Sequence, residues 1–254
     1  MSILLNLFHN QGRGRPIGGG AAPTFVPTDI AGIGLWLVGS DYTVGSWPDK
    51  SGAGFDFIQV VGANQPSAQT VGDKSVVRFD GSSDYLTRAA VLGVADTQGT
   101  LFIVFSSDEP ADAYIFSVSD DAGNSRRILF GISGAHKPEL TQRNADTADV
   151  IRGGTTINDS VWRCMVFKST GTAYNIYLNS VAEALLVSSG ANNGDWIGDC
   201  TSLDVTAIGV WQFSALYGYL KGDVVEIIYY NTGLSNADRA LVEQYLSDKY
   251  SLGF

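Results

Sequence analysis

Glycoside hydrolysis needs two carboxylates facing the scissile bond, and Asp223 and Glu226 are candidates for that role. They lie three residues apart in a stretch rich in β-branched residues. Because successive side chains of a strand point to opposite faces, this spacing predicts that the two carboxylates do not face one site. We therefore expect no catalytic pair, and we interpret Glu226 as an acceptor for backbone N–H groups of nearby loops.

Nucleophilic catalysis is not favoured by the two histidines, His9 and His136. Because His9 is close to the start of the chain, a Ser-His-Asp site would have to use His136, in a segment with Gly and Pro. The sequence contains neither a Gly-x-Ser-x-Gly elbow nor a His-rich zinc motif. We expect a protein that is not an enzyme.

Calcium is the metal that the loops suit best, because Ca²⁺ prefers hard oxygen ligands. The best candidate ligands are Asp120, Asp121 and Asn124. The two weaker candidate loops contain Asp80, Ser82 and Asp84, and Asp195 and Asp199. Asp and Asn also occupy turns because their side chains bond to the local backbone, and that local role is favoured in each loop.

Aromatic side chains in loops suit sugar binding, because a flat ring can cover the apolar face of a pyranose. Trp36 and Trp162 follow strand patterns and are expected in the core. The candidate glycan-binding residues lie in polar loops or close to the last strand: Trp47, Trp196, Trp211, Tyr217 and Tyr219. Exposed loop aromatics serve equally well as protein contacts, so both roles stay open.

Strands must position most of these residues. Runs of β-branched and aromatic residues predict strands at 34–38, 76–79, 100–105, 114–118, 127–132, 161–167, 174–178, 202–210 and 224–230. Two polar loops, 119–125 and 168–173, predict hairpins. Ser235 predicts the N-cap of a single helix near the end of the chain. The apolar face expected for this helix is Leu241, Val242, Tyr245 and Leu246.

Four stretches of the chain occur in an order known from one protein family. They are Leu35–Tyr42 with Trp47–Gly52, Val77–Leu86, Val161-Trp162 with the hairpin ending at Asn179, and Gly222–Tyr250. Together they resemble the laminin-G-like domains of the concanavalin A-like lectin/glucanase superfamily. The resemblance implies an all-β fold, a two-sheet antiparallel jelly-roll sandwich with one C-terminal helix. Catalytic members of that superfamily carry Glu, Asp and Glu at alternate strand positions, and this chain has no Glu-x-Asp-x-Glu.

Composition restricts the class of protein. The 254 residues are 44% hydrophobic and 17% charged, which is typical of a folded chain with ample core. The net charge of −10 argues against nucleic acid, because phosphate binding needs concentrated Lys and Arg. No run approaches the roughly 18 apolar residues needed to span a bilayer. We expect no membrane insertion, no secretory signal peptide, and buried free thiols at Cys164 and Cys200 rather than a disulfide.

Residues 1–28 are predicted to be an N-terminal docking arm and linker that precedes a single domain, residues 29–254. The arm combines a short apolar patch with a connector punctuated by Gly and Pro, and it holds two arginines and no acid. Such a segment is expected to become ordered on a partner, and the alternative is that it lies along its own domain. The predicted docking residues are Ile3, Leu4, Leu5, Leu7, Phe8, Arg13 and Arg15.

These observations lead to the hypothesis of a non-enzymatic virion structural protein of a phage, such as a head decoration or fibre-type subunit. It would be assembled in the host cytoplasm and would dock through residues 1–28 on other virion proteins or on copies of itself. Its lectin-like domain would face host-surface glycans. The alternatives are a free carbohydrate-binding module or, less favoured, a glycan-degrading enzyme.

Overall fold

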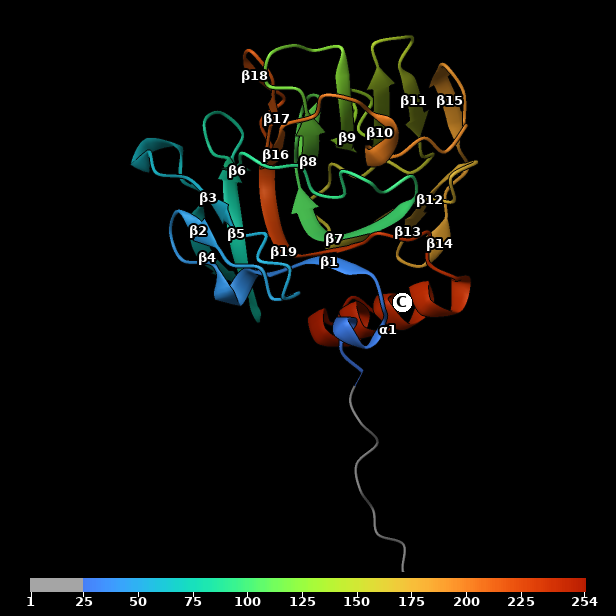
Figure 1. The fold of residues 1–254 in the computed structure, drawn as a ribbon. Helices are drawn as coiled ribbons and strands as arrows, with labels where there is room; N and C mark the ends of the chain where they lie inside the picture. The colour runs from blue at the N-terminus through green and yellow to red at the C-terminus, as the bar shows by residue number, and fades with distance from the viewer. Residues whose placement is uncertain (1–24) are drawn as a thin grey trace, which may run out of the picture.

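Two antiparallel sheets face each other in the computed structural model, which describes residues 25–254 (Figure 1). The eight-stranded sheet, called the back sheet, has the order β14-β13-β12-β7-β19-β5-β4, and β1 is a further partner of β19. Its strands are β1 (Ile33–Val38), β4 (Ser67–Val71), β5 (Lys74–Asp80), β7 (Gly99–Ser107), β12 (Arg163–Ser169), β13 (Tyr174–Leu178), β14 (Val181–Ala182) and β19 (Lys221–Tyr230).

The nine-stranded sheet, called the front sheet, has the order β15-β11-β10-β9-β8-β16-β6-β3-β2. Its strands are β2 (Ser46–Trp47), β3 (Phe57–Ile58), β6 (Leu86–Arg88), β8 (Ala113–Ser119), β9 (Arg126–Ile132), β10 (Pro138–Asn144), β11 (Asp149–Arg152), β15 (Leu186–Ser189) and β16 (Val205–Ile208). A two-stranded ribbon, β17 (Trp211–Gln212) with β18 (Leu216–Tyr217), is separate from both sheets. The chain ends in the helix α1 (Asn236–Tyr250).

The predicted fold class is confirmed: the structure is a two-sheet β-sandwich with one C-terminal helix. Strand β7 is buried along its whole length, as its continuous apolar sequence predicts. The two predicted hairpins are also present, as β8 with β9 and β12 with β13. Strands β10 and β11 were not predicted, and they supply part of the candidate site below.

The core between the sheets contains two tryptophans that the sequence placed in exposed loops, so both predictions were wrong. The indole N–H of Trp47 donates to the carbonyl of Val38 at 2.9 Å, and its ring is fully buried. Trp196 is also fully buried, 5.2 Å from the ring of Phe130, and its N–H donates to the Tyr229 hydroxyl at 3.2 Å. Each loop folds inward because its large ring gains more from burial than from exposure. Neither tryptophan can bind a glycan.

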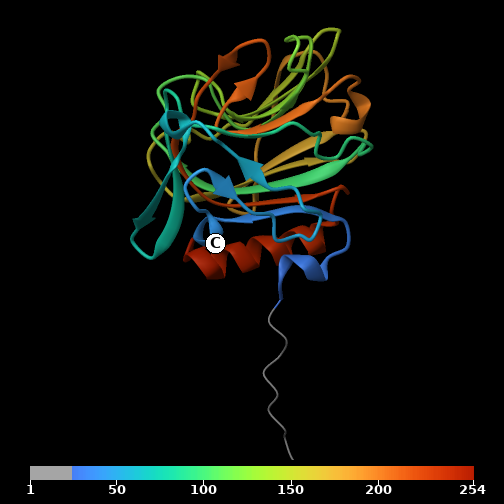
Figure 2. The same ribbon diagram turned by 60° about the vertical axis from the view of Figure 1, so that its left-hand side comes forward.

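Helix α1 covers the outer face of the back sheet, and Figure 2 shows it as a separate layer beneath that sheet. The predicted cap is confirmed, because the Ser235 hydroxyl accepts the N–H of Asp238 at 3.1 Å. The buried helix face is rotated from the predicted one: Val242, Leu246 and Tyr250 are buried, whereas Leu241 is 50% exposed.

A β-bulge at Val225 overturns the expectation that Asp223 and Glu226 face opposite ways. On β19, Val224 pairs with Phe105 and Glu226 pairs with Val104, so Val225 is an extra residue. The bulge lies where the neighbour of β19 changes from β5 to β1. The inserted residue shifts by one position the alternation of side chains between the two faces of β19. Asp223 and Glu226 therefore both lie on the outer face of the back sheet.

Glu226 is bound by side chains, not by the backbone N–H groups of loops that the sequence suggested. Its carboxylate is fully buried beneath α1. It accepts hydrogen bonds from Trp36 Nε1 at 2.7 Å, Tyr245 Oη at 3.2 Å and Lys249 Nζ at 2.6 Å, and a fourth from the Tyr250 hydroxyl. This carboxylate joins β1, β19 and α1.

The beginning of the described chain packs on its own domain. Phe25 makes an edge-to-face contact with Tyr245 at 6.0 Å, and the carbonyl of Pro27 accepts the Tyr230 hydroxyl at 2.7 Å. The predicted docking residues, Ile3 to Arg15, lie outside the described residues. Within residues 25–254, no helix has the length and apolar character to cross a membrane.

Candidate glycan-binding site

The β17–β18 ribbon lies across the outer face of the front sheet. It is fixed there by hydroxyl groups of β8, because Ser117 donates to the carbonyl of Val210 at 2.8 Å and Ser119 donates to that of Gln212. Both serines alternate with Phe116 and Val118, which point into the core between the sheets. The ribbon therefore holds its aromatic side chains over the outer ends of β8 and β9.

Four aromatic rings meet at this position, and the ring of Phe213 lies 4.3 Å from that of Trp211. Tyr114 of β8 lies 6.0 Å from the ring of Trp211 and 6.4 Å from that of Tyr217. Trp211 is almost buried, whereas the ring of Tyr217 is 50% exposed at the rim. Two of the predicted glycan-binding residues, Trp211 and Tyr217, are thus brought together, and Tyr217 offers a ring to a ligand in solvent.

Two arginines lie beside the rings. Arg127 of β9 and Arg143 of β10 are directly opposite each other in the antiparallel register. The guanidinium of Arg127 is stacked 4.6 Å from the centre of the Trp211 ring. Like charges in opposed positions repel, and burial together with Arg143 lowers the pKa of Arg127. Within residues 25–254, neither arginine forms an ion pair with a carboxylate.

Two buried hydrogen-bond donors in this cluster lack acceptors, although Nη1 of Arg127 donates to the carbonyl of Asn124. Trp211 Nε1 and Arg127 Nε are both buried, and neither has a partner within residues 25–254. Arg143 satisfies its Nε on the carbonyl of Asp146 at 2.7 Å, which leaves the rest of its guanidinium for another acceptor. Buried donors without acceptors are costly, so a ligand that supplies oxygen atoms here would be favoured. We call Tyr114, Arg127, Arg143, Trp211 and Tyr217 the aromatic-arginine face.

A second charged pair borders this face. Arg152 Nε of β11 contacts Glu139 Oε2 of β10 at 2.5 Å. Burial raises the pKa of Glu139, and the neighbouring Arg152 opposes that shift. Glu139 makes no ion pair with Arg127 or Arg143, but its charge reaches the face, because burial and then Glu139 raise the pKa of Tyr114.

The other predicted site residues do not join the face. Tyr219 is half-buried, and its pKa is raised by burial and by nearby Tyr85 and Asp80, away from Trp211. The calcium candidates make other hydrogen bonds: Asp120 accepts the N–H of Ala122 at 2.9 Å, Asp121 accepts from Gln212 at 3.0 Å, and the carbonyl of Asn124 accepts from Arg127. No cluster of three or more metal-ligating His, Cys, Asp or Glu residues occurs among residues 25–254. The geometry gives the calcium hypothesis no support.

Both cysteines are free thiols, as expected, and they lie in different places. Cys164 belongs to the cluster between the back sheet and α1, and burial raises its pKa. Cys200 accepts from the amide of Gln142 at 3.2 Å, close to β10.

Tyr114, Arg127 and Arg143 were missed as site residues. Each is an outward residue of a strand whose inward neighbours are apolar or buried, so each resembles an ordinary solvated position. The signal available in the sequence is the pair of outward arginines on two strands that could form a hairpin, 127 and 143. The two arginines can be identified as neighbours only once the register between β9 and β10 is known.

Comparison with known proteins shows the fold. No protein-family model matches the sequence, and no curated protein was matched. Among solved structures, the CBM40 domain of the Ruminococcus gnavus IT-sialidase, bound to α2,3-sialyllactose, has a TM-score of 0.56 and 18% identity, covering 66% of this chain and 95% of that one. The K499G mutant of the NanB sialidase of Streptococcus pneumoniae has a TM-score of 0.55 and 14% identity, and the match covers 65% of this chain and 27% of that one. A Trypanosoma rangeli sialidase has a TM-score of 0.57 and 15% identity, and the match covers 85% of this chain and 33% of that one. At these identities the likeness shows the β-sandwich fold alone.

Proposed function

We propose that this domain binds acidic glycans, and that the aromatic-arginine face holds the acidic sugar. The observation that carries the proposal is the opposed pair Arg127 and Arg143, without carboxylate partners, beside the unpaired indole N–H of Trp211. Two similar structures are CBM40 domains with bound α2,3- and α2,6-sialyllactose, which are carboxylated sugars. A sugar carboxylate supplies the acceptors and the negative charge that this cluster lacks.

Two parts of the aromatic-arginine face contact different parts of the sugar. The guanidinium groups of Arg127 and Arg143 bind the carboxylate, and the exposed ring of Tyr217 covers an apolar face of the sugar. The chain as a whole carries a charge of −10, so the opposed arginines differ in sign from its net charge. The local positive pair therefore selects both the position and the orientation of the acid.

Replacing Arg127 or Arg143 with glutamine is expected to weaken binding of 3′-sialyllactose by roughly 10- to 100-fold, because each change removes a charge-assisted contact. The measurement is isothermal titration calorimetry with 3′-sialyllactose and, in parallel, lactose. Arg88→Gln is the matched control: Arg88 also stacks on an aromatic ring, Phe55 at 4.4 Å, but outside the face. Equal loss in Arg88→Gln, or no loss in either site variant, would overturn the proposal.

We further propose that the domain is not catalytic. Glu226, the acid at the centre of the back sheet, is enclosed by four donors and has no free access to a substrate. Asp223 is held by Arg78 in a two-bond pair at 2.7 and 2.8 Å. Release of free sialic acid from 3′-sialyllactose by the purified protein would contradict this.

We also propose, from the sequence alone, that the protein has an assembly role in a phage virion. Residues 1–28 are basic, whereas the rest of the chain carries a net charge of −12. We expect that deleting residues 1–24 abolishes incorporation of the protein into the virion, or abolishes its self-association if it docks on copies of itself. The reason is that the apolar patch from Ile3 to Phe8 would provide the buried contact. Glycan binding should be unchanged. Full incorporation of the truncated protein, measured in purified particles, would refute the docking role.

A further inference from the structure

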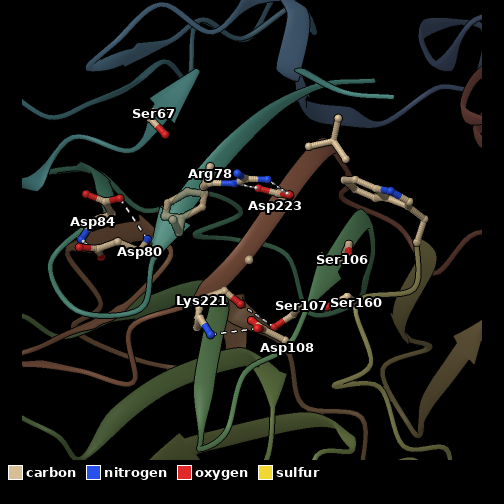
Figure 3. A pocket seen from close by; sticks show the side chains of 14 residues that line it. Ser67, Arg78, Asp80, Asp84, Ser106, Ser107, Asp108, Ser160, Lys221 and Asp223 are labelled. Carbon is tan, nitrogen blue, oxygen red and sulfur yellow. Dashed lines mark hydrogen bonds and ion pairs between the residues drawn. The ribbon is translucent and has the colours of Figure 1, made fainter. Parts of the chain in front are cut away.

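A hollow of about 570 Å³ lies on the outer face of the back sheet, and its position separates it from the aromatic-arginine face. Strands β4, β5, β7 and β19 contribute to it, at the end of the sheet where β5, not β1, is the neighbour of β19. Its volume is within the range of small-molecule sites, about 300–1,000 Å³. Figure 3 shows Arg78 and Asp223 in the middle of this hollow, with Lys221 and Asp108 on one side.

Four of the charged groups in the hollow form two ion pairs. Arg78 makes two hydrogen bonds to Asp223, at 2.7 and 2.8 Å, and Lys221 contacts Asp108 at 2.9 Å. Asp80 accepts backbone N–H groups of its own turn, including that of Ser82 at 2.8 Å. Asp80 and Asp84 also line the hollow without a cation partner among residues 25–254, and they repel an anion. A charged ligand between Arg78 and Lys221 would have to break an ion pair, so this part of the hollow is suited to an uncharged, polar molecule.

The remaining lining offers hydroxyl groups and one aromatic wall. Ser106, Ser107 and Ser160 lie on the side of the hollow opposite Asp80 (Figure 3). Ser107 donates to the carbonyl of Lys221 at 2.7 Å. Ser106 is 8% exposed as a residue, and it lines the hollow. A hydroxyl that lines a cavity can both donate a hydrogen bond to a hydroxyl group of a ligand and accept one from it.

Trp162 is the aromatic wall, and its place differs from the predicted one. The sequence assigned it to the core, but it is half-buried at the edge of the cluster beneath α1 and lines the hollow. Lys74 lies 5.9 Å from its ring centre and is itself almost buried. The indole thus combines a fixed apolar surface with nearby hydroxyl groups, the combination that suits a pyranose.

We propose that this hollow is a second carbohydrate-binding site, which takes a neutral sugar residue between Trp162, Ser106 and the Arg78–Asp223 pair. The sugar stacks on the indole, and its hydroxyl groups bond to Ser106 and to the outer oxygen and nitrogen atoms of the ion pair. The site is on the opposite sheet from the aromatic-arginine face. The domain would therefore bind two glycan chains at once, which raises its affinity for a surface that displays many of them.

Saturation-transfer NMR with the methyl glycosides of glucose, galactose, mannose and N-acetylglucosamine tests the second site. At least one of them is expected to bind the full-length protein. Trp162→Leu should weaken that binding about tenfold, because the stacking surface is lost. Ser106→Ala should weaken it about threefold or more by removing one hydrogen bond, and this small change leaves the back sheet intact.

The control is Trp211→Leu, which alters an aromatic side chain of the other face and should leave neutral-sugar binding unchanged. N-acetylneuraminic acid, titrated in parallel, should bind wild type and Ser106→Ala equally and should lose affinity in Arg127→Gln. The second site is refuted if none of the four glycosides binds, or if their binding survives both Trp162→Leu and Ser106→Ala. Failure of the acidic sugar alone would refute the aromatic-arginine face and leave the neutral site standing.

Discussion

Replacing Glu226 with glutamine is expected to lower the free energy of unfolding by about 3 kcal/mol or more. The carboxylate is fully buried and accepts from Trp36, Tyr245, Tyr250 and Lys249. An amide keeps the shape but offers one acceptor oxygen and turns an NH₂ group toward these donors. Buried donors without acceptors, and a Lys249 that loses its partner, then oppose packing of α1 on the back sheet.

Urea denaturation followed by circular dichroism measures this loss. The matched control is Asp223→Asn, which changes the other acid on the same strand and face. Its partner Arg78 is 48% exposed and can be hydrated, so we expect a loss of about 1 kcal/mol or less. If both variants lose the same free energy, Glu226 does not join the helix to the sheet as described.

Local sequence signals predicted the elements well, and the places of single side chains less well. The cap at Ser235 and the apolar run of β7 depend on residues close in sequence, and both are confirmed. Trp47 and Trp196 lie in polar segments, yet both rings fill the core between the sheets. Burial of a loop side chain is decided by what covers it, and residues distant in sequence supply that cover.

The aromatic-arginine face was only half predicted, for a related reason. Trp211 and Tyr217 were identified by type, whereas β10 was missed because Leu140 is its only strongly apolar inward residue. Its other inward side chain, Gln142, is polar and bonds to Cys200. Without β10 the opposition of Arg127 and Arg143 cannot be seen. The bulge at Val225 is equally hidden, because a strand in the sequence carries no mark of where its neighbour changes.

Alkaline pH is expected to unfold the protein cooperatively between about pH 11 and 13, mainly through four of its five buried tyrosines. Tyr174, Tyr229, Tyr230 and Tyr250 are each 6% exposed or less. Burial is the main cause that raises the pKa of each hydroxyl well above its usual value near 10, and nearby carboxylates add to it, such as Asp96 for Tyr229.

The sign of the effect follows from proton binding. Above pH 10 the unfolded chain releases protons from these tyrosines, whereas the folded chain retains them. Their contribution to stability is therefore complete below pH 10 and is lost as the pH rises. Each tyrosine contributes up to about 1.4 kcal/mol per pH unit, so four together approach roughly 5 kcal/mol per unit, against a typical total of about 5–15 kcal/mol.

Tyrosinate absorbance near 295 nm, where ionised phenol absorbs, and far-UV circular dichroism should change together across this transition. Tyr230→Phe tests this explanation, because its effect on stability should differ between neutral and alkaline pH. Near pH 7 it should cost about 1 kcal/mol, because the 2.7 Å hydrogen bond to Pro27 is lost, but its stability should fall less steeply above pH 10. Tyr217→Phe, at an exposed ring, should follow wild type throughout. Ionisation of all tyrosines near pH 10 with the fold intact would show that the four hydroxyl groups are open to solvent, against the packing described for the core and for α1.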